Sequence, residues 1–333
     1  MSDAPMIGEI TAEEFSINAR AIYDEVRKVI VGQGELIRSV LICVITGRHA
    51  LLEGVPGLGK TMLIRTLADA MSLKFSRIQF TPDLMPADIV GTNVMETTET
   101  GQREFRFQPG PVFTNLLLAD EINRATPKTQ SALLEAMQEK MVTVADHTYR
   151  LQPPFFVLAT QNPLEMEGTY PLPEAQLDRF MFKINVPFPS ADELTEIFRR
   201  TTSHESAELQ PVVSGEQIIS MGNLALQVPI ASHVNEYVAR LIVATHPESP
   251  TAPDKVRRYV RYGSSPRGGQ AIILGAKTNA LLEGRYNVSF DDIRAIATPS
   301  LRHRLLLNFE GQAEGITTDQ VIDELLDQVS TGS

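Results

Sequence analysis

Short apolar runs alternate with amphipathic stretches along the first half of the chain. The apolar runs lie at residues 49–53, 115–121, 155–160 and 180–186, and polar or glycine residues follow them. Continuous apolar runs of this length are typical of parallel strands that are covered on both faces. The segments between them, such as 60–70, show helical spacing. This alternation predicts an α/β fold with a parallel sheet, whose ligands bind outside the carboxyl ends of the strands.

The pattern changes after residue 189. Ser190 and Glu193 form a capping box that opens a helix running to about Arg200. No strand is predicted from there to Phe309, and the segment 310–316 reads as a loop. The predicted helices cover 215–226, 232–245, 266–284, 290–308 and an acidic 317–329. We therefore expect two domains, an αβα core over 1–189 and an all-helical lid over 190–333.

Two β-hairpins are predicted inside the core domain. The strand-like stretches 92–95 and 103–107 flank a polar turn at 96–102, and a second hairpin covers 141–151. Neither hairpin has an obvious packing duty, so both are candidate working surfaces.

The stretch from Gly54 to Thr61 matches the pattern G-x-x-x-x-G-K-[ST], and a predicted strand precedes it while a predicted helix follows. In such a loop the backbone N–H groups and the helix dipole surround nucleotide phosphates, while the lysine reaches the β- and γ-phosphates. The alternative is a glycine-rich turn with a surface lysine. The candidate nucleotide contacts here are Pro56, Gly57, Leu58, Gly59, Lys60, Thr61 and Met62.

Acidic and amide side chains follow two other predicted strands at the same edge of the sheet. Asp120 and Glu121 end one strand, and Asn162 follows another. The Thr61 hydroxyl and Asp120, directly or through water, would hold Mg²⁺, which keeps several waters and few protein ligands. Glu121 would act as a general base toward water, and Asn162 would orient that water or the γ-phosphate. The alternatives are a helix-capping acidic pair and an Asn-Pro turn.

Arginines near glycine- or proline-marked junctions are candidates for clamping a phosphate transition state. They are Arg124, Arg179 and Arg267. A turn at Val31, Gly32 and Gln33, about twenty residues before the phosphate loop, could place backbone against an adenine ring. A plain turn between two helices is the alternative reading of that segment.

Composition excludes several other classes of protein. The net charge of −11 argues against bulk nucleic acid as the main ligand, although basic residues gather between 254 and 304. The single cysteine, Cys43, allows no internal disulfide, and the histidines form no metal-binding cluster. No apolar run is long enough to span a membrane and no secretory signal is recognisable, so we expect a cytoplasmic protein without membrane insertion.

Several ordered motifs together resemble the AAA+ ATPases and, among them, the MoxR family. The resemblance covers about residues 10–308. The motifs are Val31-Gly-Gln33, Gly54-Val-Pro-Gly-Leu-Gly-Lys-Thr61, Leu117-Leu-Ala-Asp-Glu-Ile-Asn-Arg124, Ala159-Thr-Gln-Asn-Pro163, Gly168-Thr-Tyr-Pro-Leu-Pro-Glu-Ala-Gln-Leu-Asp-Arg-Phe180 and Ser265-Pro-Arg-Gly268.

The resemblance assigns a role to each candidate residue. Val31 and Gly32 correspond to the adenine-side contact, Lys60 and Thr61 to Walker A, and Asp120 with Glu121 to Walker B. Asn162 corresponds to sensor 1, Arg179 to the arginine finger that acts in a neighbouring subunit, and Arg267 to sensor 2. The two hairpins correspond to the helix 2 insertion and to the hairpin before sensor 1.

The resemblance also implies the cofactors and partners. It predicts binding of ATP or ADP with Mg²⁺, ring hexamers, and chaperone-like action on a client together with a von Willebrand factor A (VWA) domain protein, in enzyme maturation or cofactor insertion. Whether Arg124 also acts at the subunit interface stays open. The competing functions are a nucleic-acid-associated motor and a nucleotide-timed binding switch with slow hydrolysis. A small-molecule kinase is disfavoured because nothing resembles an acceptor pocket.

Overall fold

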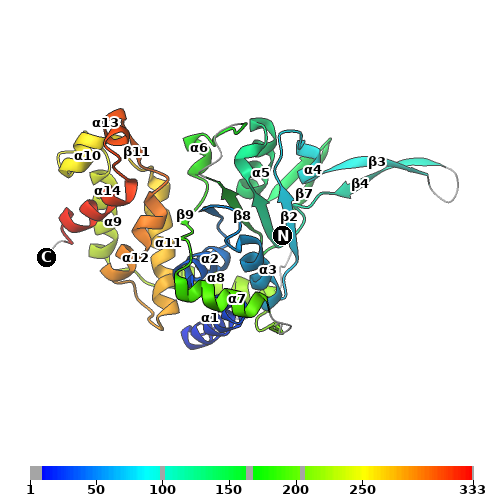
Figure 1. Cartoon of the computed structure of the whole chain (residues 1–333), viewed down its shortest axis with the longest axis horizontal. Coiled ribbons are helices and arrows are strands. Elements are labelled where there is room, and N and C mark those ends of the chain that lie inside the picture. The colour runs from blue at the N-terminus through cyan, green and yellow to red at the C-terminus, as the bar shows by residue number, and fades with distance from the viewer. Residues whose placement is uncertain (1–9, 98–101, 163–167, 203–206, 332–333) are drawn as a thin grey trace.

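The computed structural model describes residues 10–97, 102–162, 168–202 and 207–331. Its centre is a five-stranded parallel sheet in the order β2-β5-β8-β1-β9 (Figure 1). The bounds of these strands are β1 Ala50–Glu53, β2 Phe75–Gln79, β5 Leu116–Asp120, β8 Phe156–Gln161 and β9 Phe182–Asn185. The predicted parallel sheet is confirmed, and β1, β5, β8 and β9 lie within two residues of their expected ends.

Both faces of the sheet are buried, as the continuous apolar runs predict. In β5 the side chains of Leu116 and Leu118 belong to one hydrophobic cluster, while those of Leu117 and Ala119 belong to a second. Successive side chains of a strand point to opposite faces. One four-residue apolar run therefore supplies core to both layers of helices.

Helices cover both faces of the sheet. The first cluster contains buried residues of the two N-terminal helices and of the helix after the phosphate loop, and the second contains those of α5. The core helices are α1 Ala12–Arg27, α2 Gly34–Ile45, α3 Lys60–Ala70, α4 Pro86–Val90, the 3₁₀ turn η1 Ile122–Arg124, α5 Pro127–Glu139 and α6 Glu174–Leu177. The short helix α4 is not among the helices that the sequence predicts.

The two predicted hairpins are present and touch each other. They consist of β3 Gly91–Thr97 with β4 Arg103–Pro109, and β6 Met141–Val144 with β7 His147–Arg150. Residues 98–101 of the predicted first turn lie outside the described residues. The ring of Phe107 stacks on that of Tyr149 with centroids 4.0 Å apart. This contact fixes the base of the first hairpin against the second, while strands β3 and β4 extend away from the body (Figure 1).

The second half of the chain is mainly helical, but it contains one small sheet. Its helices are α7 Ala191–Thr201, α8 Gly215–Gln227, α9 Ser232–Ala244, α10 Asp254–Tyr259, α11 Pro266–Leu282, α12 Phe290–Leu301, α13 Phe309–Ala313 and α14 Thr318–Gln328. Strands β10 Val260–Tyr262 and β11 Leu306–Leu307 pair antiparallel. The expectation of no strand before Phe309 was therefore wrong, as was the helix running to 308. Both strands are too short to show a hydrophobic period.

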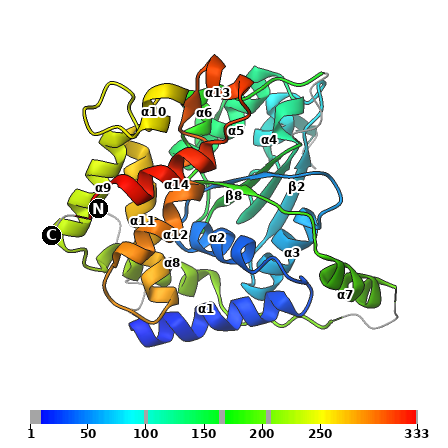
Figure 2. The ribbon, with the colours of Figure 1, turned by 60° about the vertical axis from the view of Figure 1, so that its left-hand side comes forward.

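The helical half packs on the core through a continuous hydrophobic cluster. Buried residues of α9, α11 and α12 join those of α1 and α2 in that cluster. The helix α7 opens with the predicted capping box, since the backbone N–H of Glu193 donates to the Ser190 hydroxyl. None of its residues is buried, and it lies on the outside of the molecule (Figure 2). The boundary at 189/190 stays a prediction, because the two halves share one core.

A buried histidine ties three core elements together. His49, just before β1, accepts a hydrogen bond at Nδ1 from the N–H of Val157 in β8. Its Nε2 therefore carries the proton and donates to the carbonyl of Met137 in α5, 3.1 Å away. Burial is the main cause that lowers the pKa of His49 to about 4. Burial likewise depresses the pKa of His303.

We predict that these histidines make the free energy of unfolding depend on pH. An unfolded histidine binds a proton below about pH 6.5, whereas His49 in the folded chain stays neutral until about pH 4. Stability is therefore lost as the pH falls through this window, by up to about 1.4 kcal/mol per pH unit for each histidine. The variant His49→Asn, whose side-chain oxygen can replace Nδ1, should show a shallower slope of the free energy of unfolding against pH. That free energy is measured by urea denaturation at several pH values. Identical slopes for both proteins would contradict the assignment.

Candidate functional site

The phosphate loop bridges the end of β1 and the start of α3, as predicted. Gly57 and Gly59 have φ angles of 85° and 75°, which glycine adopts without strain. No atom lies within 4 Å of where a Cβ would stand on either glycine, so the backbone is open on that side. Because α3 begins at Lys60, its first backbone N–H groups lie beside the loop. The free N–H groups of a helix N-terminus favour binding of an anion.

A cavity of about 590 Å³ lies beside this loop, at the carboxyl edge of the sheet. It brings together the candidate residues from the loop, from the end of β5 and from the end of β8. Its lining residues are Pro56, Gly57, Leu58, Gly59, Lys60, Thr61, Met62, Arg65, Arg77, Gln79, Asp120, Glu121, Thr160 and Asn162. Sequence reasoning missed Arg65, Arg77, Gln79 and Thr160.

Lys60 is held at the mouth of the loop. Its Nζ donates to the carbonyl of Gly54 at 2.6 Å. Partial burial lowers the pKa of Lys60, and the charges of Asp120 and Glu121 act in the opposite direction. The ammonium group thus faces two carboxylates in a half-buried setting, where an added anion gains most from its charge.

Asp120 ends β5 with both carboxylate oxygens engaged. Arg77 of β2 donates to Oδ2 at 2.7 Å, and the Thr160 hydroxyl donates to Oδ1 at 2.7 Å. The Thr61 hydroxyl lines the same cavity. One carboxylate and one hydroxyl fit a Mg²⁺ ion that keeps most of its waters. Each oxygen of Asp120 accepts one hydrogen bond and keeps a further lone pair, which could face the ion directly or through one of its waters.

Glu121 is anchored in a conformation that L-residues rarely adopt. Its φ angle is 56°, and its backbone N–H donates to the Thr160 hydroxyl at 2.9 Å. Its Oε2 accepts hydrogen bonds from Gln79 at 2.7 Å and from Arg124 at 2.9 Å. These contacts direct the carboxylate into the cavity. Arg124 is thus an ion-pair partner of Glu121 within this chain, and its role at a subunit interface stays a prediction.

Of the remaining candidate nucleotide contacts, one lines the cavity and the other three do not. Asn162 lines the cavity and is nearly buried, as expected for a residue directly after β8. The turn at Val31, Gly32 and Gln33 contributes no lining residue. A Cβ on Gly32 would collide with the Glu193 side chain at the start of α7. Its proposed adenine contact therefore stays a prediction.

Arg179 and Arg267 lie together in a second cavity at the opposite, amino edge of the sheet. This cavity, of about 190 Å³, is bounded by the residues before β1 and β9 and by the end of α5. Its lining residues are Gly47, Arg48, His49, Met137, Gln138, Lys140, Asp178, Arg179, Met181, Arg267, Gln270, Ala271, Leu274 and Arg304. From His49 to Gly54 along β1 is roughly 16 Å at the rise of a strand. Neither arginine therefore lies at the phosphate loop of its own chain.

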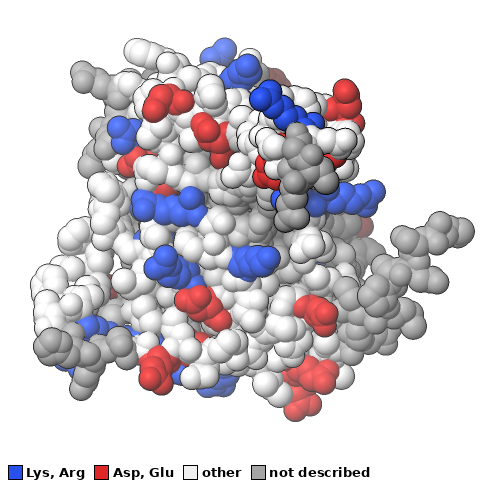
Figure 3. All heavy atoms as spheres, turned by 90° about the vertical axis from the view of Figure 1, so that its right-hand side faces the viewer, with Lys and Arg blue, Asp and Glu red and all other residues white. Residues whose placement is uncertain are grey.

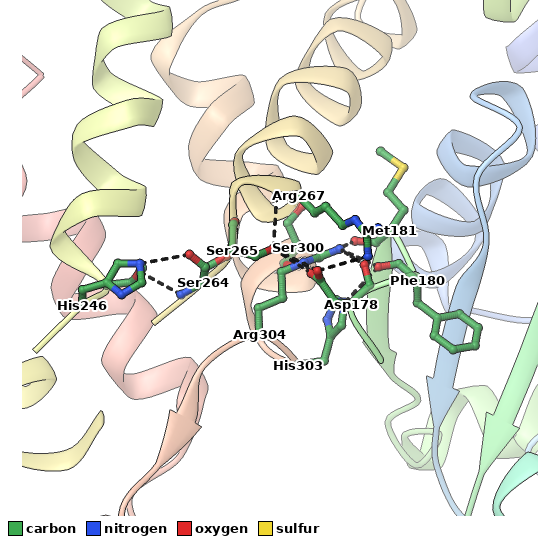
Figure 4. Close-up of polar contacts among 11 residues, drawn as sticks. Asp178, Phe180, Met181, His246, Ser264, Ser265, Arg267, Ser300, His303 and Arg304 are labelled. Carbon is green, nitrogen blue, oxygen red and sulfur yellow. Dashed lines mark hydrogen bonds and ion pairs between the residues drawn. The ribbon is translucent and has the colours of Figure 1, made fainter. Parts of the chain in front are cut away.

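Asp178 joins the helical half to the segment that carries Arg179 (Figure 4). It accepts hydrogen bonds from the Ser265 hydroxyl at 3.0 Å and from Nε of Arg304 at 2.7 Å, and it pairs with Arg267 at 3.5 Å. Arg304 is buried, and its other donors bind backbone carbonyls of Asp178, Phe180, Met181 and Ser300. Sequence reasoning missed the ion pair between Asp178 and Arg304, because the two residues lie on distant segments.

No group of three or more His, Cys, Asp or Glu side chains suited to a metal ion occurs in the described ranges. Within those same ranges, no helix is long and apolar enough to cross a membrane.

Comparison with known proteins defines the class. The family model for the ATPase family associated with various cellular activities (AAA) matches residues 49–182, and that for the AAA lid domain matches residues 254–325. The class is therefore an AAA ATPase core with its lid.

Individual relatives define the family. The chain is 42% identical to "Chaperone MoxR1" of Mycobacterium tuberculosis over 98% of this chain and 86% of that protein. It is 32% identical to "Protein MoxR" of Paracoccus denitrificans, over 84% and 86% of the two chains. The crystal structure of a putative ATPase from Cytophaga hutchinsonii superposes with a TM-score of 0.89 at 43% identity, over 96% of both chains. The chain belongs to the MoxR family of AAA+ ATPases, and the predicted fold class and family are confirmed.

We predict that Arg304→Met is strongly destabilising. Removing one partner of a buried ion pair leaves the other charge uncompensated, which costs about 3–5 kcal/mol. The matched variant Arg267→Met removes the exposed partner of the same carboxylate, and it should cost about 1 kcal/mol or less. Denaturant titrations compare the two midpoints. Equal losses would show that Asp178 does not depend on the buried arginine.

Proposed function

We propose that this protein hydrolyses ATP with Mg²⁺ at the boundary between two copies of itself, as a chaperone-like remodeller of other proteins. Membership of an ATPase family and the assembly of the phosphate loop, Asp120 and Glu121 around one cavity support the hydrolytic part. The relative named as a chaperone supports the remodelling part.

Each residue of the first cavity would have a separate role in phosphoryl transfer. The backbone around Gly57 and Gly59 together with Lys60 would hold the phosphates, and Thr61 with Asp120 would hold Mg²⁺. The ion would neutralise charge on the phosphate oxygens. Glu121 would accept the proton of the attacking water, and Asn162 would orient that water, since both lie on the same wall. Gln79 and Arg124 both bind Oε2 of Glu121, so Oε1 would be the oxygen that accepts the proton.

One observation supports the proposal that the active site lies between two copies. Arg179 and Arg267 lie at the opposite edge of the sheet from the phosphate loop. A guanidinium that clamps the transition state must reach the γ-phosphate, and neither side chain is long enough to reach its own. Each would therefore act on the nucleotide of a neighbouring copy. A closed homo-oligomer, such as the hexameric ring that the family resemblance implies, would give every phosphate loop such a neighbour.

The hairpins are the surfaces that we propose for partners and clients, among them a VWA-domain protein. Met95 and Phe105 face each other across the first hairpin and are more than half exposed. The face from which this hairpin projects carries both basic and acidic side chains (Figure 3). A mixed surface fits a protein partner better than a nucleic acid, which favours a continuous basic face.

We predict that Glu121→Gln binds ATP but loses about 10²- to 10⁴-fold in turnover, because the general base is absent. Arg179→Ala should lose about 10³- to 10⁵-fold, as removal of an arginine finger does. When the two variants are mixed, the Glu121→Gln copy supplies Arg179 to a neighbouring Arg179→Ala copy, which keeps its own Glu121, so part of the ATPase rate should return. No recovery in rings verified to be mixed would reject the assignment of Arg179 to a neighbour.

The variant Arg267→Ala tests whether Arg267 acts on the nucleotide of its own chain or on that of a neighbouring copy. If Arg267 acts on a neighbour, its variant should recover activity with Glu121→Gln but not with Arg179→Ala. Recovery with Arg179→Ala would mean that Arg267 serves the nucleotide of its own chain.

A further inference from the structure

The second cavity contains two cations that no proposed role explains. Arg48 precedes β1, and Lys140 follows the last residue of α5. Both line the cavity beside Arg179 and Arg267. In the part of the chain that the structure describes, neither side chain makes a hydrogen bond or an ion pair.

The cavity holds more positive charge than it neutralises. Its lining contains five cationic side chains and one carboxylate, that of Asp178. Asp178 is already paired with Arg304 and Arg267, while Arg179 donates to the carbonyl of Leu134, which carries no net charge. Within the described ranges none of Arg48, Lys140 and Arg179 forms an ion pair, although Glu139 lines the adjoining cavities beside them.

Arg48 and Lys140 are both exposed residues, and their charges act on each other. Partial burial is the first cause that lowers the pKa of Lys140, and the charge of Arg48 is the second. Like charges at short range destabilise a fold unless an anion joins them. An anion within reach of both side chains would therefore be attracted by both charges.

We propose that Arg48 and Lys140 complete a phosphate-binding site, which receives the phosphates of the nucleotide held by a neighbouring copy. This inference rests on the proposed function, because Arg179 must face that nucleotide. A triphosphate carries several negative charges and can meet all the unpaired cations at once, whereas a single carboxylate would neutralise only one. Guanidinium groups also match phosphate geometry through paired hydrogen bonds.

Lys140 connects this site to the second hairpin. The residue has a φ angle of 52°, and its carbonyl accepts the backbone N–H of Leu151 at 2.9 Å, which closes the base of the β6–β7 hairpin. Tyr149 in that hairpin stacks on Phe107 of the first hairpin. A phosphate bound by Lys140 would thus act at the point from which both candidate working surfaces extend.

The test measures assembly rather than turnover. All proteins carry Glu121→Gln, so that ATP persists, and sedimentation gives the dissociation constant between protomers with ATP and with ADP. The double variant Arg48→Gln, Lys140→Asn removes both charges, and asparagine tolerates the positive φ angle. We expect it to weaken ATP-bound assembly by at least about tenfold. ADP-bound assembly should change far less, because the γ-phosphate is missing.

Two controls make the measurement specific. Lys128→Ala removes an exposed lysine at the other end of α5 and should leave assembly unchanged. Lys140→Arg keeps the charge, so in combination with wild-type Arg48 it should retain ATP-dependent assembly. Reduced assembly with Lys128→Ala, or no rescue by arginine, would contradict a specific role for the charge of Lys140.

Three results would overturn the inference. Unchanged ATP-bound assembly of the double variant would remove Arg48 and Lys140 from the site. Equal weakening with ATP and ADP would mean that they bind an acidic protein surface. The third result concerns inorganic triphosphate, whose binding to the Lys60→Ala protein is measured by calorimetry. If the double variant abolishes this binding but leaves assembly unaffected, free phosphate is the ligand. If Arg179→Ala recovers activity in mixed rings while the double variant behaves as wild type, the proposed function stands and only this inference fails.

Discussion

The parallel direction of the five strands is the constraint on which the rest of this molecule depends. It places the carboxyl ends of β1, β5 and β8 at one edge of the sheet, where the phosphate loop, Asp120 and Asn162 meet around one cavity. It places the beginnings of β1 and β9 at the other edge, where Arg179 lies. A strand's length then separates two sets of residues that a single phosphoryl transfer would need together. Assembly of identical copies is a direct way to bring such sets into contact.

A second constraint is the buried guanidinium of Arg304. A charge taken out of water must have its hydrogen-bonding groups satisfied. Arg304 achieves this with the carboxylate of Asp178 and with carbonyls of the turn before β9. That turn also carries Arg179, so the position of the helical half and the direction of Arg179 depend on the same contacts. The position of the lid is thus mechanically linked to the residue that we assign to a neighbouring active site.

Most core elements could be predicted because their signals are local. A continuous apolar run is enough to identify β5, and the capping box at Ser190 is enough to start α7. The errors fall where no local signal exists. The strands β10 and β11 have three and two residues, and they form because pairing across the lid supplies their hydrogen bonds. The helix α12 ends before Arg304, whose side chain reaches back to Asp178.

The sequence by itself determined the order of strands and helices, the phosphate loop, and the acidic and amide residues that follow the strands. These follow from spacing along the chain, because periodicity and turn chemistry act over a few residues. Only the tertiary structure decided which charges meet. Arg77 reaches Asp120 because β2 pairs with β5, and Arg267 reaches Asp178 because the lid docks on the turn before β9. Such meetings depend on strand order and on docking between distant segments, for which no local pattern carries information.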